Sequence, residues 1–172
     1  LTLVDDGIKP KGLASKPFDG EGVPTMKNMI IENGILKSFI YNMRAAKRAG
    51  VKSTGNASRG GFSSLPGIGT HNVYIAPGKS LRNEIIAATQ KGLLVKEVTG
   101  YGIDPVSGNF SGGVSGFWIE NGKILHPVKG VTIAGKAFEI LNAIDMMGND
   151  PDMNRTFASP TFRVAEMQIG GK

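Results

Sequence analysis

Ile31-Glu-Asn-Gly-Ile-Leu36 and Ile119-Glu-Asn-Gly-Lys-Ile124 are the two stretches that decide the fold class. In each, Asn-Gly stands between apolar residues, and this dipeptide suits the centre of a tight hairpin because both central positions need a positive φ. The sequence therefore predicts two antiparallel hairpins, within residues 26–41 and 117–128. The Ile-Glu-Asn-Gly sequence that both stretches share fits either an internal duplication or two turns that reached the same sequence independently. Chance convergence is the safer interpretation.

The rest of the chain predicts further strands and three helices around these hairpins. A basic helix ends at Gly50, a second begins after Ser80, and the clearest apolar periodicity belongs to the third. Hairpins without regular strand-helix alternation favour an α+β domain rich in antiparallel sheet, barrel-like in form, over a doubly wound sheet. The predicted strands are residues 72–76, 93–98, 108–119, 128–133 and 161–169, and the predicted helices are 42–49, 80–90 and 135–147.

Length and composition predict one globular domain over residues 1–172. The chain has 172 residues, 25 glycines, two histidines and no cysteine. Without cysteine, disulfides, thiolate nucleophiles and sulfur-ligated zinc sites are excluded, and two histidines do not make a metal cage. No apolar run reaches the roughly 18 residues of a membrane span, so we expect a cytoplasmic protein with no membrane partner. The chain starts inside an apparent strand, and we suspect that an N-terminal region precedes it.

The net charge of +6 is concentrated in the N-terminal half. A basic face attracts nucleic acid, an acidic partner or an anionic peptide terminus, although a solvated face explains it equally well. Few aromatic residues interleave the charges and no nucleic-acid motif is present, which argues against nucleic acid. Between Asn33 and Asn83 there is no acidic residue, whereas the basic residues are Lys37, Arg44, Lys47, Arg48, Lys52, Arg59, Lys79 and Arg82.

Several segments begin like catalytic or binding motifs and then depart from them. Residues 130–137 have the glycines and lysine of a phosphate loop, but Ala137 stands where a hydroxyl should hold magnesium. Residues 150–161 begin like a calcium loop, but Arg155 replaces its glycine. Carboxylates at 5–6 and 19–21 are more typical of backbone hydrogen-bond acceptors than of acid-base pairs. We therefore predict no catalytic residue in this chain.

Ordered blocks along the whole chain resemble the TldD/PmbA family. They include Val4-Asp-Asp-Gly7, Ser53-Thr-Gly-Asn-Ala57, Gly108-Asn-Phe-Ser111, Gly130-Val-Thr-Ile-Ala-Gly135 and Gly148-Asn-Asp150. Members of this family are described as modulators of DNA gyrase and as zinc-dependent peptidases that work as dimers. The resemblance implies the C-terminal domain of a larger protein, with an N-terminal α/β region absent from this sequence.

The resemblance also bears on zinc. TldD-type members bind it with an HExxxH helix and a cysteine in the loop after the Gly-Asn-Asp block, and here residues 150–160 contain no cysteine. In lacking this cysteine the chain is similar to the PmbA-type subunits, which lack the metal ligands. The resemblance therefore implies no metal and no cofactor in this chain, with zinc only in a TldD-type partner or a complete metal-bearing member.

The implied function is proteolysis or peptide maturation by a complex in which this chain supplies scaffold and substrate cleft, as a homodimer or with a TldD-type partner. Small residues allow another backbone to approach, so loop 50–72 and segment 108–116 are the predicted sites for an extended peptide. The alternatives are a basic binding module associated with nucleic acid or gyrase and a purely structural dimerisation domain. The predicted substrate-binding residues are Gly55, Asn56, His71, Asn72, Gly112 and Gly113.

Overall fold

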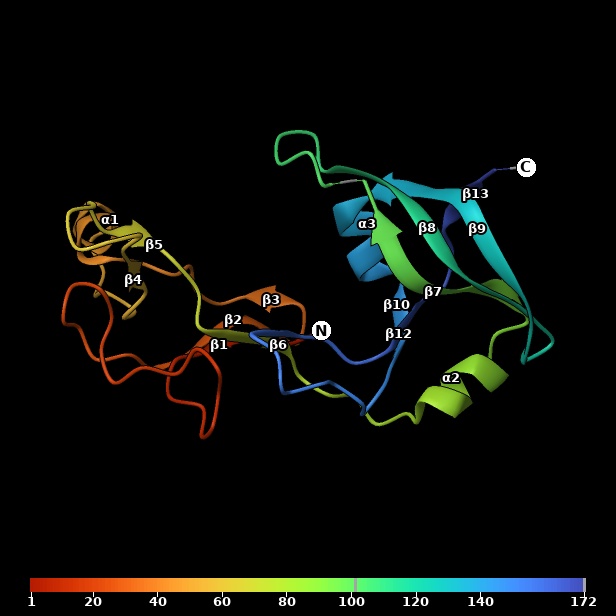
Figure 1. The fold of residues 1–172 in the computed structure, drawn as a ribbon, viewed down its shortest axis with the longest axis horizontal. Helices are drawn as coiled ribbons and strands as arrows, with labels where there is room; N and C mark the ends of the chain where they lie inside the picture. Colours follow the sequence, from red (N-terminus) through yellow and green to blue (C-terminus); the bar gives the residue numbers. More distant parts are fainter. Residues whose placement is uncertain (101, 172) are drawn as a thin grey trace. The chain divides into compact units, whose positions relative to one another are not determined.

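The computed structural model describes residues 1–100 and 102–171 (Figure 1), and the chain divides into two compact units. Unit 1 contains residues 1–77 and 151–160, and unit 2 contains residues 78–150 and 161–172. The segment predicted as a single domain therefore contains two compact parts, and the chain passes between them more than once.

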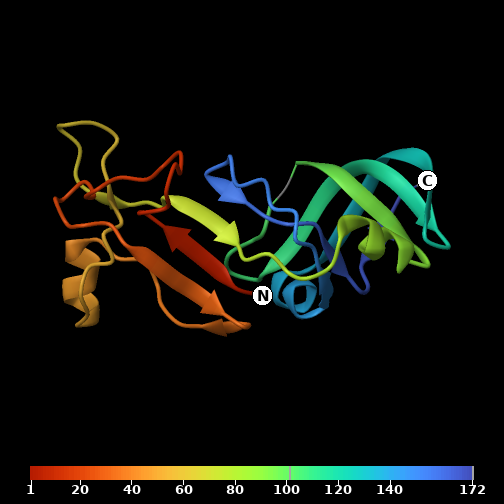
Figure 2. The same ribbon diagram turned by 90° about the horizontal axis from the view of Figure 1, so that it is seen from below.

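Unit 1 is built on a five-stranded sheet with the order β11-β6-β1-β2-β3 (Figure 2). Its strands are β1 (Leu3–Asp6), β2 (Lys27–Glu32), β3 (Ile35–Leu36), β6 (Asn72–Ile75) and β11 (Phe157–Ala158). Only the β11–β6 pairing is parallel. A separate ribbon pairs β4 (Ala57–Ser58) with β5 (Gly67–Ile68). The sheet places the end of β1 opposite the start of β6, which decides where the polar residues of unit 1 meet.

Both Asn-Gly hairpins are confirmed. Asn33 has φ 51° and Gly34 φ 83° between β2 and β3, and Asn121 has φ 50° and Gly122 φ 74° between β8 (Asn109–Glu120) and β9 (Lys123–Lys136). These are the positive φ values that the turn requires. The basic helix is also confirmed as α1 (Met43–Ala49), because the Asn42 side chain accepts a hydrogen bond from the Ala45 amide and Gly50 ends the helix at φ 68°.

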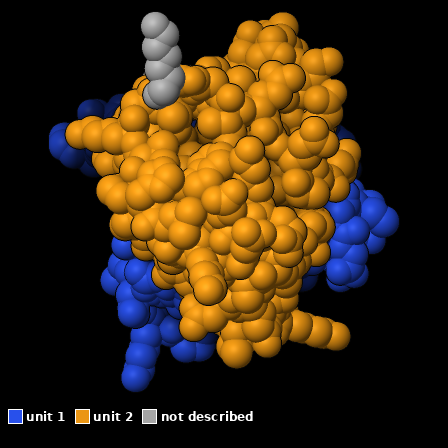
Figure 3. Space-filling view, turned by 90° about the vertical axis from the view of Figure 1, so that its right-hand side faces the viewer, with its two compact units in different colours: residues 1–77, 151–160 blue, residues 78–150, 161–172 orange. Residues whose placement is uncertain are grey.

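Unit 2, orange in Figure 3, contains an open antiparallel sheet with the order β13-β9-β8-β7. Here β7 is Lys91–Thr99 and β13 is Gln168–Gly170, while β10 (Ile144–Met147) pairs with β12 (Phe162–Val164) in a second sheet. Gly130, taken from the phosphate-loop-like segment, has φ 76° where the β8–β9 register shifts. It is a bulge inside a continuous strand, so no phosphate-binding turn exists there. Among the described residues of unit 2, the buried apolar ones are Ile85, Val114, Ile119 and Ile133.

The predicted third helix over 135–147 is wrong in its second half. Only α3 (Ala137–Asn142) is helical, none of its residues is buried, and Phe138 is 77% exposed. Residues 144–147 form β10, because pairing with β12 satisfies their backbone groups and overrides the local helical pattern. The predicted strand 161–169 is likewise divided into β12 and β13.

The second helix is shorter than predicted. It is α2 (Arg82–Ala87), preceded by Leu81 rather than Ser80 at the cap position, and the Glu84 carboxylate accepts a hydrogen bond from the Leu81 amide. Ile85 is buried, whereas Leu81 is 53% exposed. The α+β class and the three helices are nevertheless confirmed. None of the helices among the described residues has the length and apolarity needed to cross a membrane.

An ion pair joins the two strands of the smaller sheet in unit 2. Arg163 Nε and Nη2 donate to Asp145 Oδ1 and Oδ2 at 2.9 and 2.6 Å, and Nη1 donates to the Ala88 carbonyl. The hydrogen bonds from Arg163 lower the pKa of the Asp145 carboxyl below its ordinary value.

A carboxyl whose pKa is lowered by folding stabilises the folded state above its unfolded pKa of about 3.9 and loses that contribution as the pH falls through its folded value. We therefore expect Arg163→Gln to reduce the loss of stability between about pH 5 and pH 3. The difference should be at most about 1 kcal/mol, because water screens a pair whose carboxylate is 38% exposed. Urea unfolding at several pH values measures it, with exposed Arg44→Gln as control; identical acid limbs for Arg163→Gln and the unmodified protein would contradict it.

Candidate functional site

The interior of unit 1 contains many polar side chains besides small apolar ones. Its largest fully buried side chains are Asp5, Asn56 and Asn72, each no more than 1% exposed, and His71 and Asn28 are also buried. Five side chains, Asp5, Asn28, Thr54, Asn56 and His71, form one connected hydrogen-bonded group, which we call the polar cluster. The cluster brings together β1, β2, the residue that precedes β6 and the loop that ends at β4.

Asn56 is the centre of the cluster because all four hydrogen-bonding positions of its amide are used. Its Nδ2 donates to Asp5 Oδ2 at 2.6 Å and to the Gly69 carbonyl at 2.9 Å. Its Oδ1 accepts from Asn28 Nδ2 at 3.1 Å and from Thr54 Oγ1 at 2.7 Å. A primary amide has two donors and an oxygen with two lone pairs, so these four contacts use its full capacity, and His71 Nδ1 lies 3.4 Å from Asn56 Nδ2 beside them.

His71 and Asp5 form a buried pair whose members are distant in sequence. The His71 amide donates to Asp5 Oδ1 at 2.6 Å, and His71 Nδ1 lies 3.2 Å from Asp5 Oδ2. A carboxylate that orients an imidazole is one part of a nucleophilic triad. The same contacts also anchor the end of loop 50–72 on β1. The loop is therefore held to the sheet through Asp5, a partner that cannot be inferred from the residues next to His71 in the sequence.

The predicted site residues of unit 1 lie close together in the fold. Asn56 and His71 belong to the cluster, Gly55 directly precedes Asn56, and Asn72 Nδ2 donates to the Asp6 carbonyl and to Ser15 Oγ. Among the described residues, no buried side-chain nitrogen or oxygen lacks a hydrogen-bond partner. A group that binds substrate needs a free donor or acceptor, so the contacts support a structural role for these side chains. Their assignment to substrate binding remains a prediction.

Gly112 and Gly113 belong to unit 2, within β8. This strand pairs with β7 on one side and with β9 on the other, so the prediction that segment 108–116 is a free edge for a peptide strand is wrong. A Cβ on Gly112 would lie 3.0 Å from Val98 Cγ1, so a bulkier residue there would disturb β7. Substrate binding by these two glycines through another contact remains a prediction.

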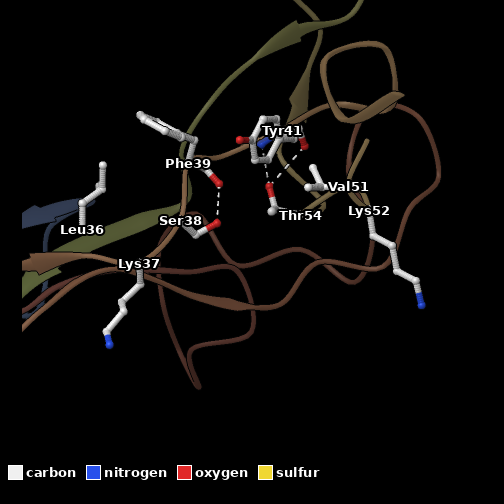
Figure 4. A pocket seen from close by; sticks show the side chains of 8 residues that line it. All are labelled: Leu36, Lys37, Ser38, Phe39, Tyr41, Val51, Lys52 and Thr54. Atoms are coloured by element: carbon white, nitrogen blue, oxygen red, sulfur yellow. Dashed lines mark hydrogen bonds between the residues drawn. The ribbon is translucent and has the colours of Figure 1, made fainter. Parts of the chain in front are cut away.

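A groove of about 270 Å³ lies beside the cluster in unit 1 (Figure 4). Thr54 belongs to both features, because its hydroxyl contacts Asn56 and also accepts a hydrogen bond from the Tyr41 amide at 2.7 Å. The cluster thus fixes one wall of the groove. We call it the Lys37–Lys52 groove; its lining residues are Leu36, Lys37, Ser38, Phe39, Tyr41, Val51, Lys52 and Thr54.

The residues described do not fit a zinc ion. Across residues 1–100 and 102–171, no three His, Asp or Glu side chains are placed to hold a metal together, and the sequence contains no cysteine. In the calcium-like segment, Asp152 instead accepts a hydrogen bond from Arg155 Nε at 2.8 Å, and Asp150 accepts from the Thr161 amide and hydroxyl. The carboxylates of this segment therefore cap turns.

Fold and sequence together define the class to which this chain belongs. The family model described as the PmbA/TldA metallopeptidase C-terminal domain matches residues 1–171. The chain is a member of the PmbA/TldA metallopeptidase family, and the resemblance found in its sequence is confirmed.

The relatives that match include both PmbA-type and TldD-type proteins. Metalloprotease PmbA of Escherichia coli O157:H7 is 36% identical over 172 residues, which cover 100% of this chain and 36% of the relative. A metalloprotease TldD homologue of Buchnera aphidicola subsp. Acyrthosiphon pisum is 38% identical over 185 residues, covering 99% of this chain and 38% of the relative. The chain thus spans little more than a third of the curated relatives it matches.

Solved structures share the fold. A Thermotoga maritima protein titled as a proposed modulator of a DNA gyrase matches with a TM-score of 0.88 and 36% identity, over 98% of this chain and 39% of its own. TldE from Thermococcus kodakarensis matches with a TM-score of 0.84 and 34% identity, over 99% of this chain and 39% of its own. The arrangement of strands and helices described above is therefore the fold of this family's C-terminal domain.

Proposed function

We propose that this chain is the C-terminal domain of a PmbA-like subunit of a TldD/PmbA-type zinc peptidase complex, acting in proteolysis of peptides or in peptide maturation. The observation that carries the proposal is the membership of a metallopeptidase family together with a described structure that offers no cluster of metal ligands. In this proposal the zinc belongs to a TldD-type partner, and this chain contributes scaffold and peptide contacts.

The aligned lengths support the PmbA side. Identity does not separate the two sides, since the PmbA and TldD relatives are 36% and 38% identical to this chain. The match to PmbA extends over 172 positions, whereas the match to the TldD homologue extends over 185, which is more than the chain has residues. The TldD homologue therefore carries extra residues relative to this chain. The absence of cysteine from residues 150–160 points in the same direction.

An extended peptide substrate needs a sheet edge with unused backbone groups. In unit 2 the long edge strand is β7, which stands at the end of the strand order and pairs with β8 on its inner side. A register shift between Val95 and Glu97 interrupts that pairing, and Val98 is 52% exposed. In place of β8, we propose β7 as the strand to which a peptide adds.

The test is a reconstitution with the protein that carries this chain and a TldD-type subunit. We expect no cleavage of a fluorogenic, unstructured peptide by this protein alone, and more cleavage by the pair than by the TldD-type subunit alone. Zinc is measured in parallel after washing with a chelator. Cleavage by this protein alone, or stoichiometric zinc in the washed protein, would contradict the proposal.

A second function is favoured by the charge distribution and by the name of a structural relative. The stretch between Asn33 and Asn83 holds eight basic residues and no acidic one, and the Thermotoga maritima relative is titled as a proposed modulator of a DNA gyrase. A binding module associated with nucleic acid or gyrase would use this stretch. Binding through phosphates weakens steeply as salt rises, whereas peptide pairing through backbone groups does not, so a salt titration separates the two functions.

A further inference from the structure

We propose that the Lys37–Lys52 groove binds a short acidic peptide segment through one aromatic or branched aliphatic side chain. This inference goes beyond the peptidase proposal and does not depend on it, because it concerns a binding surface of unit 1 and requires neither zinc nor a partner subunit. The anchor follows from the groove's apolar walls and volume, and the acidic character follows from its charge.

The walls of the groove expose large apolar side chains. Leu36 is 53% exposed, Phe39 61% and Val51 50%. Phe39 and Tyr41 form an edge-to-face pair with ring centroids 6.5 Å apart. Clustered apolar surface of this kind marks interaction sites more often than single exposed residues do. A partner that covers these three side chains would gain the free energy of their burial.

The volume limits what can enter. Pockets for whole small molecules usually measure about 300–1,000 Å³, and this groove measures about 270 Å³. It suits one large side chain better than a cofactor or nucleotide. A single inserted side chain surrounded by weaker contacts is also how most peptide anchors work. The apolar walls require that side chain to be aromatic or branched aliphatic.

The charge of the rim selects an acidic partner. In Figure 4, Lys37 and Lys52 lie on opposite sides of Ser38, Tyr41 and Thr54. Lys37 Nζ lies 3.5 Å from Glu32 Oε2, and both side chains are about half exposed. Exposed pairs contribute at most about 1 kcal/mol, so a peptide carboxylate can compete for Lys37. Carboxylates on both sides of the anchor would meet one lysine each.

The backbone near the groove suits an extended peptide better than nucleic acid. β3 is the last strand of its sheet and pairs only with β2 among the described residues, so its outer side has free backbone groups. Nucleic acid binds through several aromatic platforms in sequence, while this groove offers only the paired rings of Phe39 and Tyr41. The observations therefore favour a peptide over an oligonucleotide.

Fluorescence anisotropy tests the proposal with a labelled peptide of six acidic residues around a central Phe. We expect binding to weaken about tenfold for Lys52→Glu and about tenfold for Phe39→Ala, each equivalent to about 1.4 kcal/mol. The matched controls are Lys123→Glu and Phe138→Ala, which change exposed residues of unit 2 and should alter binding less than about twofold. Replacing the peptide's Phe by Ala, or its acids by Lys, should also abolish most of the binding.

Thermal unfolding of each variant shows that the groove changes leave the fold intact, as their exposure predicts. The proposal is overturned if the acidic peptide does not bind at about 1 mM, or if the groove variants bind it as well as the unmodified protein does. It is also overturned if a labelled oligothymidine binds more tightly than the peptide and loses affinity in the same two variants. Since no cleavage is measured, failure here is distinct from failure of the peptidase proposal.

Discussion

Replacing Asn56 with Ala is expected to destabilise the protein by about 3 kcal/mol or more, because Asp5, Asn28 and Thr54 would each lose a buried partner. At roughly 2–4 °C per kcal/mol for a chain of this size, the melting temperature should fall by about 6–12 °C. Asn56→Asp should cost more, since it removes both amide donors and places a second carboxylate against Asp5. Calorimetry or urea unfolding measures the change.

The matched control is Asn154→Ala, which changes an exposed asparagine of the same unit and should alter stability by less than about 0.5 kcal/mol. If Asn56→Ala were as mild as this control, the polar cluster would not hold unit 1 together. In that event the predicted role of Asn56 in substrate binding would gain support. The same unfolding experiment therefore distinguishes a structural side chain from one kept free for a ligand.

Gly55→Ala is expected to be far more damaging than Gly50→Ala, although both glycines have nearly the same φ. Their φ values are 69° and 68°, and an L-residue there costs about 1–2 kcal/mol. A Cβ on Gly50 meets nothing within 4 Å, whereas one on Gly55 would lie 2.5 Å from the Pro24 carbonyl oxygen and 2.9 Å from Thr25 Cα. Backbone would have to move, and the total cost should exceed about 3 kcal/mol.

Comparing the two variants removes the shared effect of φ. Urea unfolding should give about 1 kcal/mol for Gly50→Ala, and the excess for Gly55→Ala measures the close approach of residues 24–25 alone. Equal losses would mean that the neighbouring backbone yields easily. Because Gly55 precedes Asn56, a large excess would also explain why glycine is needed here without any contact to substrate.

Local signals were sufficient for the turns and for one helix. The Asn-Gly pairs dictate positive φ wherever they occur, and Asn42 and Gly50 mark the two ends of α1 regardless of what packs on it. The helix expected over 135–147 failed because β12, some twenty residues further on in sequence, offers residues 144–147 a better set of backbone partners. Periodicity within a segment carries no information about such a partner.

The candidate site is likewise predictable only in part from the sequence. Gly55, Asn56, His71 and Asn72 are predicted as parts of the peptide-binding loop 50–72, but the partner of His71 is Asp5, 66 residues earlier, and only the pairing of β1 with β6 brings them together. In the sequence, the available sign of this partner is a pair of acidic residues at the end of an apolar strand. The Lys37–Lys52 groove was missed because exposure of Leu36 and Phe39 depends on what covers them, although the acid-free stretch around it was visible in the sequence.

The polar interior of unit 1 has a thermodynamic consequence. Exposure of apolar surface raises the heat capacity of unfolding, and exposure of polar surface lowers it. A unit whose largest fully buried side chains are two asparagines and an aspartate should therefore unfold with a small heat-capacity change for its size. Its free energy of unfolding would vary with temperature along a flatter curve than that of unit 2, whose core is made of isoleucine and valine.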